Sequence, residues 1–216
     1  MVLFGSVLFL ICFLLTAVFR GSFNTINLNV NLWADSVNSG FFTPAAKVIS
    51  VIFNTTALFI LTVIVAVYLF ATHHKNYSLL LLGAMAGDAL LVQIFKTLVM
   101  SPRPLNEIIA SGGYSFPSGH TTGSVVFFGV LTYFAWVHWG SKKVKLATGG
   151  FYVSITALVG FDRIYLNVHW FSDIIGAVFL GAFWLSFCIL TFKYATSNHR
   201  VQNFSQNERK TVPPTS

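Results

Sequence analysis

The sequence predicts an all-α fold, an integral membrane bundle of six transmembrane helices. Of its 216 residues, 55% are hydrophobic and only 9% are charged, whereas a soluble domain usually carries about 25% charged residues. Several apolar runs approach the roughly 20 residues that a helix needs to cross a bilayer. These runs do not alternate polar and apolar residues, as the strands of a membrane β-barrel would.

Six segments have the length and the apolar character of membrane spans. In order along the chain they are Val2–Phe19, Val48–Ala71, Ser78–Met100, Thr121–Trp139, Leu146–Phe161 and Ile174–Phe192. The first lacks a basic start and continues as a full span, so we expect a retained helix rather than a cleaved signal peptide. The spans make one domain, residues 1–192, and the polar, basic tail of residues 193–216 has the composition of a disordered segment.

The net charge of +7 is spread unevenly along the chain. If six helices cross in turn, the basic loop at residues 140–145 and the basic tail fall on one side of the membrane. The positive-inside rule then places that side, with both termini, in the cytoplasm, and the expected location is a plasma or inner membrane. Nucleic acid is not an expected partner, because the tail lacks interleaved aromatic residues and the chain has no basic domain.

The two cysteines carry no signal of a disulfide or a metal site. Cys12 and Cys188 both lie inside apolar runs, where a cysteine behaves as a small buried hydrophobic residue. The sequence therefore indicates no metal, and it leaves the oligomeric state open.

Three short polar clusters interrupt the apolar sequence, at residues 96–104, 117–120 and 163–173. Polar groups inside a membrane chain are costly, so each cluster needs a reason. In the expected topology all three fall on the extracytoplasmic side. This agreement favours one shared site on that side.

The first cluster supplies two cations at the end of the third span. Lys96 lies within the span, and Pro102 and Pro104 flank Arg103 in a stretch that cannot continue a helix. The chain should turn there, so that Lys96 and Arg103 approach each other from the helix end and from the loop. Taken alone, each cation could instead extend to the lipid headgroups.

The second cluster, Pro117-Ser118-Gly119-His120, stands directly before an apolar run. Ser118 is suited to the N-cap position, which leaves the backbone N–H groups of Gly119 and His120 facing outward. A helix N-terminus of this kind favours a bound anion. Taken alone, the pattern is also that of an ordinary capped helix with a histidine at the membrane surface.

The third cluster contains Arg163, His169 and Asp173 at the start of the last span. His169 and Asp173 are four residues apart and would share one face of a helix. The carboxylate of Asp173 can then accept a hydrogen bond from Nδ1–H of His169, which leaves the Nε2 lone pair free. The alternative for this pair is a structural contact at the membrane interface.

Together the clusters offer three cations, a histidine with a free lone pair, a second histidine and a capped helix end. Phosphoryl transfer requires these groups, because it needs positive charge on the phosphate oxygens, a nucleophile in line and an acid for the leaving oxygen. The sequence therefore indicates a site that binds a phosphate and transfers it through histidine.

The order and spacing of these residues resemble the type 2 phosphatidic acid phosphatase superfamily, which includes glucose-6-phosphatase and vanadium haloperoxidases. The family pattern is a lysine, six residues and Arg-Pro, then Pro-Ser-Gly-His, then an arginine, five residues, a histidine, three residues and an aspartate. Here the pattern is met, with every spacing, by Lys96, Arg103-Pro104, Pro117-Ser118-Gly119-His120, Arg163, His169 and Asp173. It covers residues 96–173, and the six-span layout extends the likeness to about Phe192.

The resemblance implies a role for each residue of the pattern. The phosphate would be held by groups from all three clusters, namely Lys96, Arg103, Arg163, Ser118 and the backbone N–H of Gly119. His169 would attack phosphorus and become a phosphohistidine, with Asp173 orienting it. His120 would protonate the leaving group and then activate water. The resemblance implies no metal and no organic cofactor.

Membrane embedding makes a lipid phosphate the expected substrate. Bacterial enzymes that the chain resembles act on phosphatidylglycerophosphate, phosphatidic acid or undecaprenyl diphosphate. The sequence does not choose among these lipids, or between a monoester and a diphosphate. Two alternatives stay open: a phosphatase for a soluble ester, similar to glucose-6-phosphatase, and a transporter that binds phosphate without chemistry.

Two carboxylates fall outside the family pattern. Asp88 lies inside the third span, eight residues before Lys96, and acids in such places usually face the bundle interior. We expect it to make a polar contact, to assist Lys96, or to serve the substrate or a proton. Asp162 directly precedes Arg163, where the family often has a small residue. Its carboxylate either weakens the grip of Arg163 on phosphate or faces water.

Overall fold

The computed structural model describes the backbone of residues 2–211 and the side chains of residues 3–197. Within the described backbone the chain forms helices and no strand, which confirms the predicted all-α class. The elements in order are α1 (Val2–Val18), the 3-10 helix η1 (Arg20–Phe23), α2 (Asn24–Val37), α3 (Phe42–Ile52), α4 (Thr55–Ala71), α5 (Lys75–Val99), α6 (Gly119–His138), α7 (Lys142–Tyr165) and α8 (Phe171–Thr211).

Among the described residues, four helices are long and apolar enough to cross a membrane: α5, α6, α7 and, as far as Ser197, α8. Up to six spans result if each of two bent pairs is counted as one span. One pair joins residues 3–18 to residues 20–37 with a bend of 76°, and the other joins α3 to α4 with a bend of 49°. α1 and α4 have 17 residues each, about 25 Å of helix, which is at the short end of the lengths that span a bilayer.

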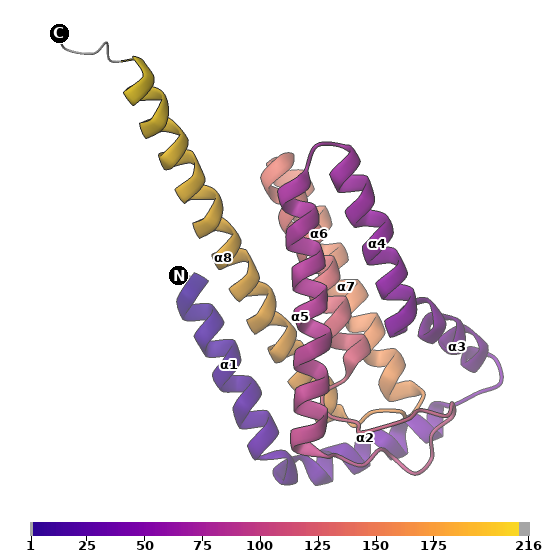
Figure 1. Ribbon diagram of the computed structural model, residues 1–216. Coiled ribbons are helices and arrows are strands. Elements are labelled where there is room, and N and C mark those ends of the chain that lie inside the picture. Colours follow the sequence, from indigo (N-terminus) through magenta and orange to yellow (C-terminus); the bar gives the residue numbers. More distant parts are fainter. Residues whose placement is uncertain (1, 212–216) are drawn as a thin grey trace.

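Helices α4 to α8 form the bundle, and α1 packs along α8 at its side (Figure 1). α2 runs across one end of this bundle, next to the connection between α7 and α8 and the long loop between α5 and α6 (Figure 1). The start of α1 and the connection between α4 and α5 lie toward the opposite end. The fold therefore brings the three polar clusters to one end of the bundle, as their shared side in the expected topology predicts.

The segment between the first two expected spans, residues 20–47, is more than a connection. It contains η1, α2 and the first part of α3. In α2 the polar residues Asn27, Asn31 and Asp35 recur at four-residue intervals on one face, while Leu28 and Leu32 are exposed. α2 does not stand out among the apolar runs of the sequence, because its own sequence is too polar to be recognised as a span.

α8 continues to Thr211, well beyond the predicted end of the last span at Phe192. Residues 193–211 are helical in the described backbone, residues 212–216 lie outside the described residues, and the disordered character of the tail stays a prediction. The helix can extend because no glycine or proline occurs between Phe192 and Pro213, and these are the two residue types that most disfavour a helix.

A buried phenylalanine directly before the second polar cluster packs against α8. Phe116 is fully buried and lies against Gly176, where an added Cβ would come within 2.4 Å of the ring. The ring also stacks on Phe13 of α1, with centroids 5.8 Å apart, and the Arg20 guanidinium lies 5.4 Å from its centroid. Contacts with α1 and α8 therefore fix the loop directly before Pro117.

Candidate active site

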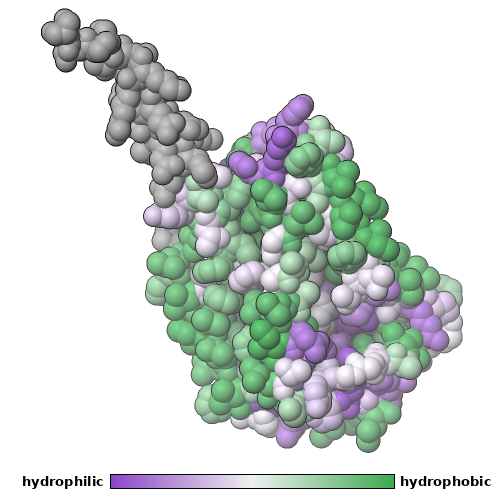
Figure 2. Space-filling view, in the orientation of Figure 1, coloured by the Kyte–Doolittle hydropathy of each residue, from purple (hydrophilic) through white to green (hydrophobic). Residues whose placement is uncertain are grey.

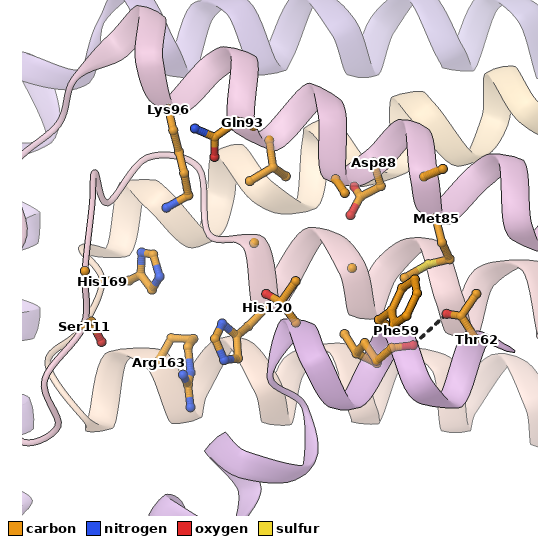
Figure 3. A pocket seen from close by; sticks show the side chains of 18 of the residues that line it. Phe59, Thr62, Met85, Asp88, Gln93, Lys96, Ser111, His120, Arg163 and His169 are labelled. Atoms are coloured by element: carbon orange, nitrogen blue, oxygen red, sulfur yellow. Dashed lines mark hydrogen bonds between the residues drawn. The ribbon is translucent and has the colours of Figure 1, made fainter. Parts of the chain in front are cut away.

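A cavity of about 740 Å³ lies between α4, α5 and α6 and extends to the polar end of the bundle (Figure 3). At one end it is lined by ionisable side chains, namely Lys96, Arg103, His120, Arg163 and His169. At the other end the walls are mostly apolar and include Leu58, Phe59, Val63, Leu82, Met85 and Ala86. Figure 2, drawn in the orientation of Figure 1, shows hydrophilic residues gathered in a hollow of the surface, which is otherwise largely hydrophobic. The cavity is therefore amphipathic along its length.

Of the eight predicted site residues, Ser118 and Asp173 are the two that do not line the cavity. Both are fully buried behind its wall. The side chains of Lys96, His120 and His169 point toward one another from α5, α6 and the connection between α7 and α8 (Figure 3). Groups from all three sequence clusters thus meet in one place.

His169 lies in the connection between α7 and α8, two residues before α8 begins. Its Nδ1 is 3.3 Å from Oδ2 of Asp173 in the first turn of α8. The backbone N–H of Trp170 donates to the same oxygen at 2.9 Å. The other ring nitrogen, Nε2, lies 3.5 Å from Nη1 of Arg103. The four-residue spacing therefore brings the predicted pair together, although His169 itself precedes the helix.

The imidazole of His169 is uncharged at neutral pH. Burial lowers the pKa of His169 to about 4. The hydrogen bond and the negative charge of Asp173 oppose this shift, and the cations Arg103 and Lys96 reinforce it. A neutral ring whose Nδ1 faces a carboxylate keeps on Nε2 the lone pair that a nucleophile needs.

Lys96 and Arg103, the two cations of the first cluster, are held by backbone carbonyls near the polar end of the cavity. The Lys96 ammonium donates a hydrogen bond to the carbonyl of Tyr114. The Arg103 guanidinium donates to the carbonyl of Gly112 at 3.1 Å and to that of Val168 at 2.6 Å. Arg103 therefore links the loop between α5 and α6 to the residue that precedes His169.

Ser118 is the N-cap of α6, as the sequence predicts. Its Oγ accepts a hydrogen bond from the backbone N–H of Thr121 at 3.4 Å and another from the Thr121 hydroxyl at 3.1 Å. Gly119 and His120 follow in the first turn of α6 and line the cavity. The N-terminus of α6, which favours negative charge, therefore lies at the cavity wall, whereas the Ser118 oxygen is turned toward the helix.

Asp162 and Arg163 form a buried ion pair near the end of α7. Each side chain is 2% exposed. Nε of Arg163 donates to Oδ2 of Asp162 at 3.1 Å, and Nη2 donates to the same oxygen. Of the two alternatives for Asp162, the one in which it faces water is therefore wrong. The acid contacts the guanidinium that lines the cavity and orients it.

Residues 77–197, more than half of the chain, match the PAP2 superfamily. The protein belongs to this superfamily. The match spans all three polar clusters, and it confirms the resemblance to the type 2 phosphatidic acid phosphatases.

Curated relatives of this PAP2 protein are lipid phosphatases by name. Phosphatidylglycerophosphatase B of Bacillus subtilis (strain 168) is 28% identical over 151 residues, which are 68% of this chain and 70% of that protein. Lipid phosphate phosphatase delta of Arabidopsis thaliana is 25% identical over 194 residues, or 82% of this chain. The chain spans only 45% of the length of that plant protein.

Solved structures share the PAP2 fold of this chain. One is the crystal structure of a transmembrane PAP2 type phosphatidylglycerolphosphate phosphatase from Bacillus subtilis, with a TM-score of 0.80 and 23% identity over 88% of this chain and 97% of the other. Another is Aquifex aeolicus LpxE, with a TM-score of 0.59 and 23% identity over 78% of this chain and 95% of the other. At this identity the likeness establishes the fold.

The sequence analysis missed the polar contacts by which α2 holds the site of this PAP2 protein. The backbone N–H of Ser172 donates to Oδ1 of Asn27 at 3.0 Å, and Nδ2 of Asn27 donates to the Ser172 hydroxyl at 3.1 Å. One turn further along α2, Nδ2 of Asn31 donates to Oδ1 of Asn167 at 2.8 Å. These contacts fall on either side of His169 in the sequence, so α2 fixes the segment that carries it.

Asp35, the third polar residue on this face of α2, joins the connection between α7 and α8 to the loop between α5 and α6. Nδ2 of Asn167 donates to Oδ1 of Asp35 at 2.5 Å, and Nδ2 of Asn106 donates to Oδ2 of the same carboxylate. The interval of four residues between Asn27, Asn31 and Asp35 is the period of one helix face. This interval is the signal in the sequence that could have indicated a polar face directed at a partner.

Proposed function

We propose that this chain is a metal-independent membrane lipid phosphatase that works through a phosphohistidine. The observation that carries the proposal is the amphipathic cavity, with three cations and two histidines at one end and apolar side chains at the other. A phosphate group matches the cationic end, and the hydrocarbon of a lipid matches the apolar end. A soluble sugar phosphate fits less well, because it would need polar partners beyond its phosphate.

In the first step, Nε2 of His169 attacks phosphorus. The N–P bond forms as the bond between phosphorus and the leaving oxygen breaks, and His120 gives its proton to that oxygen. The three cations and the backbone N–H of Gly119 stabilise the charge on the phosphate oxygens. Asp173 stabilises the positive ring that develops on His169.

In the second step, His120, now neutral, takes a proton from water. The resulting hydroxide attacks phosphorus, the N–P bond breaks, and free phosphate leaves. Both histidines then return to their starting protonation states. The side chains of this site are not arranged as metal ligands, since within residues 3–197 no group of three or more His, Cys, Asp or Glu is placed to hold a metal ion.

Phosphate release by the purified protein in detergent tests the proposal. We expect turnover of phosphatidylglycerophosphate, phosphatidic acid or undecaprenyl diphosphate, and we expect excess EDTA to leave the rate unchanged because the steps use only side chains. Glucose 6-phosphate is the soluble control and should be a poor substrate. A requirement for added magnesium, or release from none of the lipids, would contradict the proposal.

We further propose six spans, with both termini and the tail in the cytoplasm and the catalytic end on the extracytoplasmic side of a plasma or inner membrane. Charge supports this orientation, because Lys142, Lys143 and Lys145 lie at the start of α7, at the far end of that helix from Arg163. In this arrangement α2 would lie along the outer membrane surface.

Labelling of single introduced cysteines tests the orientation. A cysteine at the exposed Gly112 should react with a membrane-impermeant thiol reagent in intact cells, whereas one at Ser205 should react only after lysis. The parent protein is the background, because Cys188 is buried and Cys12 is half-buried within α1. The reverse pattern would place the catalytic end in the cytoplasm.

Asn27→Ala should lower kcat about tenfold with a small change in KM. The substitution removes the hydrogen-bond partner of the Ser172 N–H, one residue before Asp173. Leaving a buried donor unpaired costs about 1–3 kcal/mol, and a tenfold change in rate corresponds to about 1.4 kcal/mol. Steady-state kinetics on a lipid phosphate measure the split between kcat and KM. Asn24→Ala is the matched control, because Asn24 is exposed one turn earlier on α2. If Asn27→Ala lowers only the unfolding temperature, its contact stabilises the fold without positioning His169.

A further inference from the structure

A carboxyl group that the proposed mechanism does not use lies in the wall of the cavity. Asp88 is on α5, the residue is 4% exposed, and it lines the cavity (Figure 3). The Thr122 hydroxyl of α6 contacts the carboxyl group. Its Oδ1 has no hydrogen-bond partner within the part of the chain that the structure describes. A buried acid in a membrane span with an unpaired oxygen is costly, so Asp88 calls for a functional role.

Asp88 stands about one helical turn deeper in the membrane than His120. A Cβ added at Gly123 would lie 3.7 Å from Oδ2 of Asp88, so the two residues face each other across α5 and α6. Gly123 follows His120 by three residues, about 4.5 Å of helix. Lys96 follows Asp88 by eight residues, about 12 Å of helix. Along the bundle, the level of Asp88 is therefore nearer to that of His120 than to that of Lys96.

The position of Asp88 matches a particular part of a bound lipid. In the proposed mechanism His120 protonates the leaving oxygen, so the leaving alcohol begins at His120 and extends into the cavity toward Asp88. The second carbon of that alcohol then lies between the levels of His120 and Gly123, and the missing side chain of Gly123 lets the α6 backbone come close to the carboxyl group and to Leu58. Beyond this level the walls are apolar and suit hydrocarbon, as with Phe59 and Met85.

We propose that Asp88 accepts a hydrogen bond from a hydroxyl group on the second carbon of the leaving alcohol. The protein then prefers lipid phosphates with a free glycerol-type hydroxyl beside the phosphoester, an inference that rests on the proposed function. Phosphatidylglycerophosphate and 1-acyl-glycerol 3-phosphate have this hydroxyl. Phosphatidic acid is acylated at that carbon, and undecaprenyl diphosphate has no such group.

A matched pair of substrates isolates this one hydroxyl. The pair is 1-acyl-glycerol 3-phosphate and its 2-deoxy analogue with the same acyl chain. For the wild-type protein we expect kcat/KM to be about tenfold higher with the hydroxyl, the ordinary worth of one buried hydrogen bond to a polar group. The ratio of the two kcat/KM values is the readout, because a general loss of activity or stability cancels in it.

Three variants assign the preference to the carboxyl oxygen. Asp88→Leu should abolish the preference, whereas Asp88→Asn should retain most of it, because the amide oxygen still accepts a hydrogen bond. Thr62→Val is the matched control. Thr62 lines the same cavity, but its hydroxyl donates to the carbonyl of Leu58 at 2.7 Å, so the ratio should stay at the wild-type value.

Equal kcat/KM values of the wild-type protein for the two substrates would overturn the inference, whatever the variants do. A preference for the hydroxyl that survives in Asp88→Leu would also overturn the inference. If the leucine variant does not insert into the membrane, Asp88→Ala takes its place in this test. These outcomes leave the proposed function intact, since phosphate is still released. Release from no lipid phosphate at all would overturn the proposed function and this inference together.

Discussion

Phosphate release by the His169→Ala variant is expected to fall by a factor of about 10⁴ or more, to the level of the background. The variant keeps the three cations and the helix end, so it still binds a phosphate, but it has no nitrogen that can form a bond to phosphorus. Phosphate release in detergent and the unfolding temperature are the measurements. The variant should remain folded, because the ring is one contact among several that hold this connection to α2 and α8.

His120→Ala is the matched control for His169→Ala, because both histidines line the same cavity. With a lipid diphosphate labelled on the terminal phosphate, the leaving group needs little help from an acid. The first step can then proceed while the second lacks its base, so His120→Ala should accumulate label on the protein. His169→Ala should retain no label. Near-normal phosphate release by His169→Ala, or label on that variant, would remove His169 from the role of nucleophile.

Asp162→Ala should reduce both stability and phosphate binding. Asp162 and Arg163 are almost fully buried, and their hydrogen bonds hold the guanidinium in one orientation. Removing one partner of a buried ion pair leaves the other charge uncompensated, which destabilises a protein by about 3–5 kcal/mol. We therefore expect a lower unfolding temperature and a KM for lipid phosphate that is about tenfold higher or more. Thermal unfolding and steady-state kinetics measure the two effects separately.

Glu107→Ala is the control for Asp162→Ala, because Glu107 also pairs with an arginine of the site. Its carboxylate lies 3.8 Å from Nε of Arg103, and both side chains are more exposed than the Asp162 pair. A looser pair of this kind contributes little, so the effect should be much smaller than that of Asp162→Ala. A lower KM in Asp162→Ala would mean that the acid weakens the grip of Arg163 on phosphate, the alternative that the sequence left open.

Several features of the site could be predicted because they depend on residues close in sequence. Ser118 caps α6 because a hydroxyl before an apolar run satisfies an N–H of the next turn. His169 and Asp173 meet because four residues bring side chains to one side of a turn or helix. The apolar helices that could span a membrane were recognised because apolar residues collect in runs of the length of a bilayer.

Other features could not be predicted, because they depend on contacts between distant segments. The partners of Asn27 and Asn31 are more than a hundred residues away, at Ser172 and Asn167. The burial of Asp162 likewise depends on how the helices pack around the end of α7, which the sequence around Arg163 does not specify.

The sequence by itself determined the helical class, the membrane character and the residue types of the proposed phosphoryl-transfer site, because hydropathy, capping and four-residue spacing are local properties of a chain. Only the tertiary structure decided that α2 lies across the end of the bundle and holds the segment around His169. It also decided that Asp162 contacts Arg163 and that Asp88 lines the cavity opposite Gly123. These outcomes depend on which helix faces are buried against each other, and burial is settled by the packing of the whole chain.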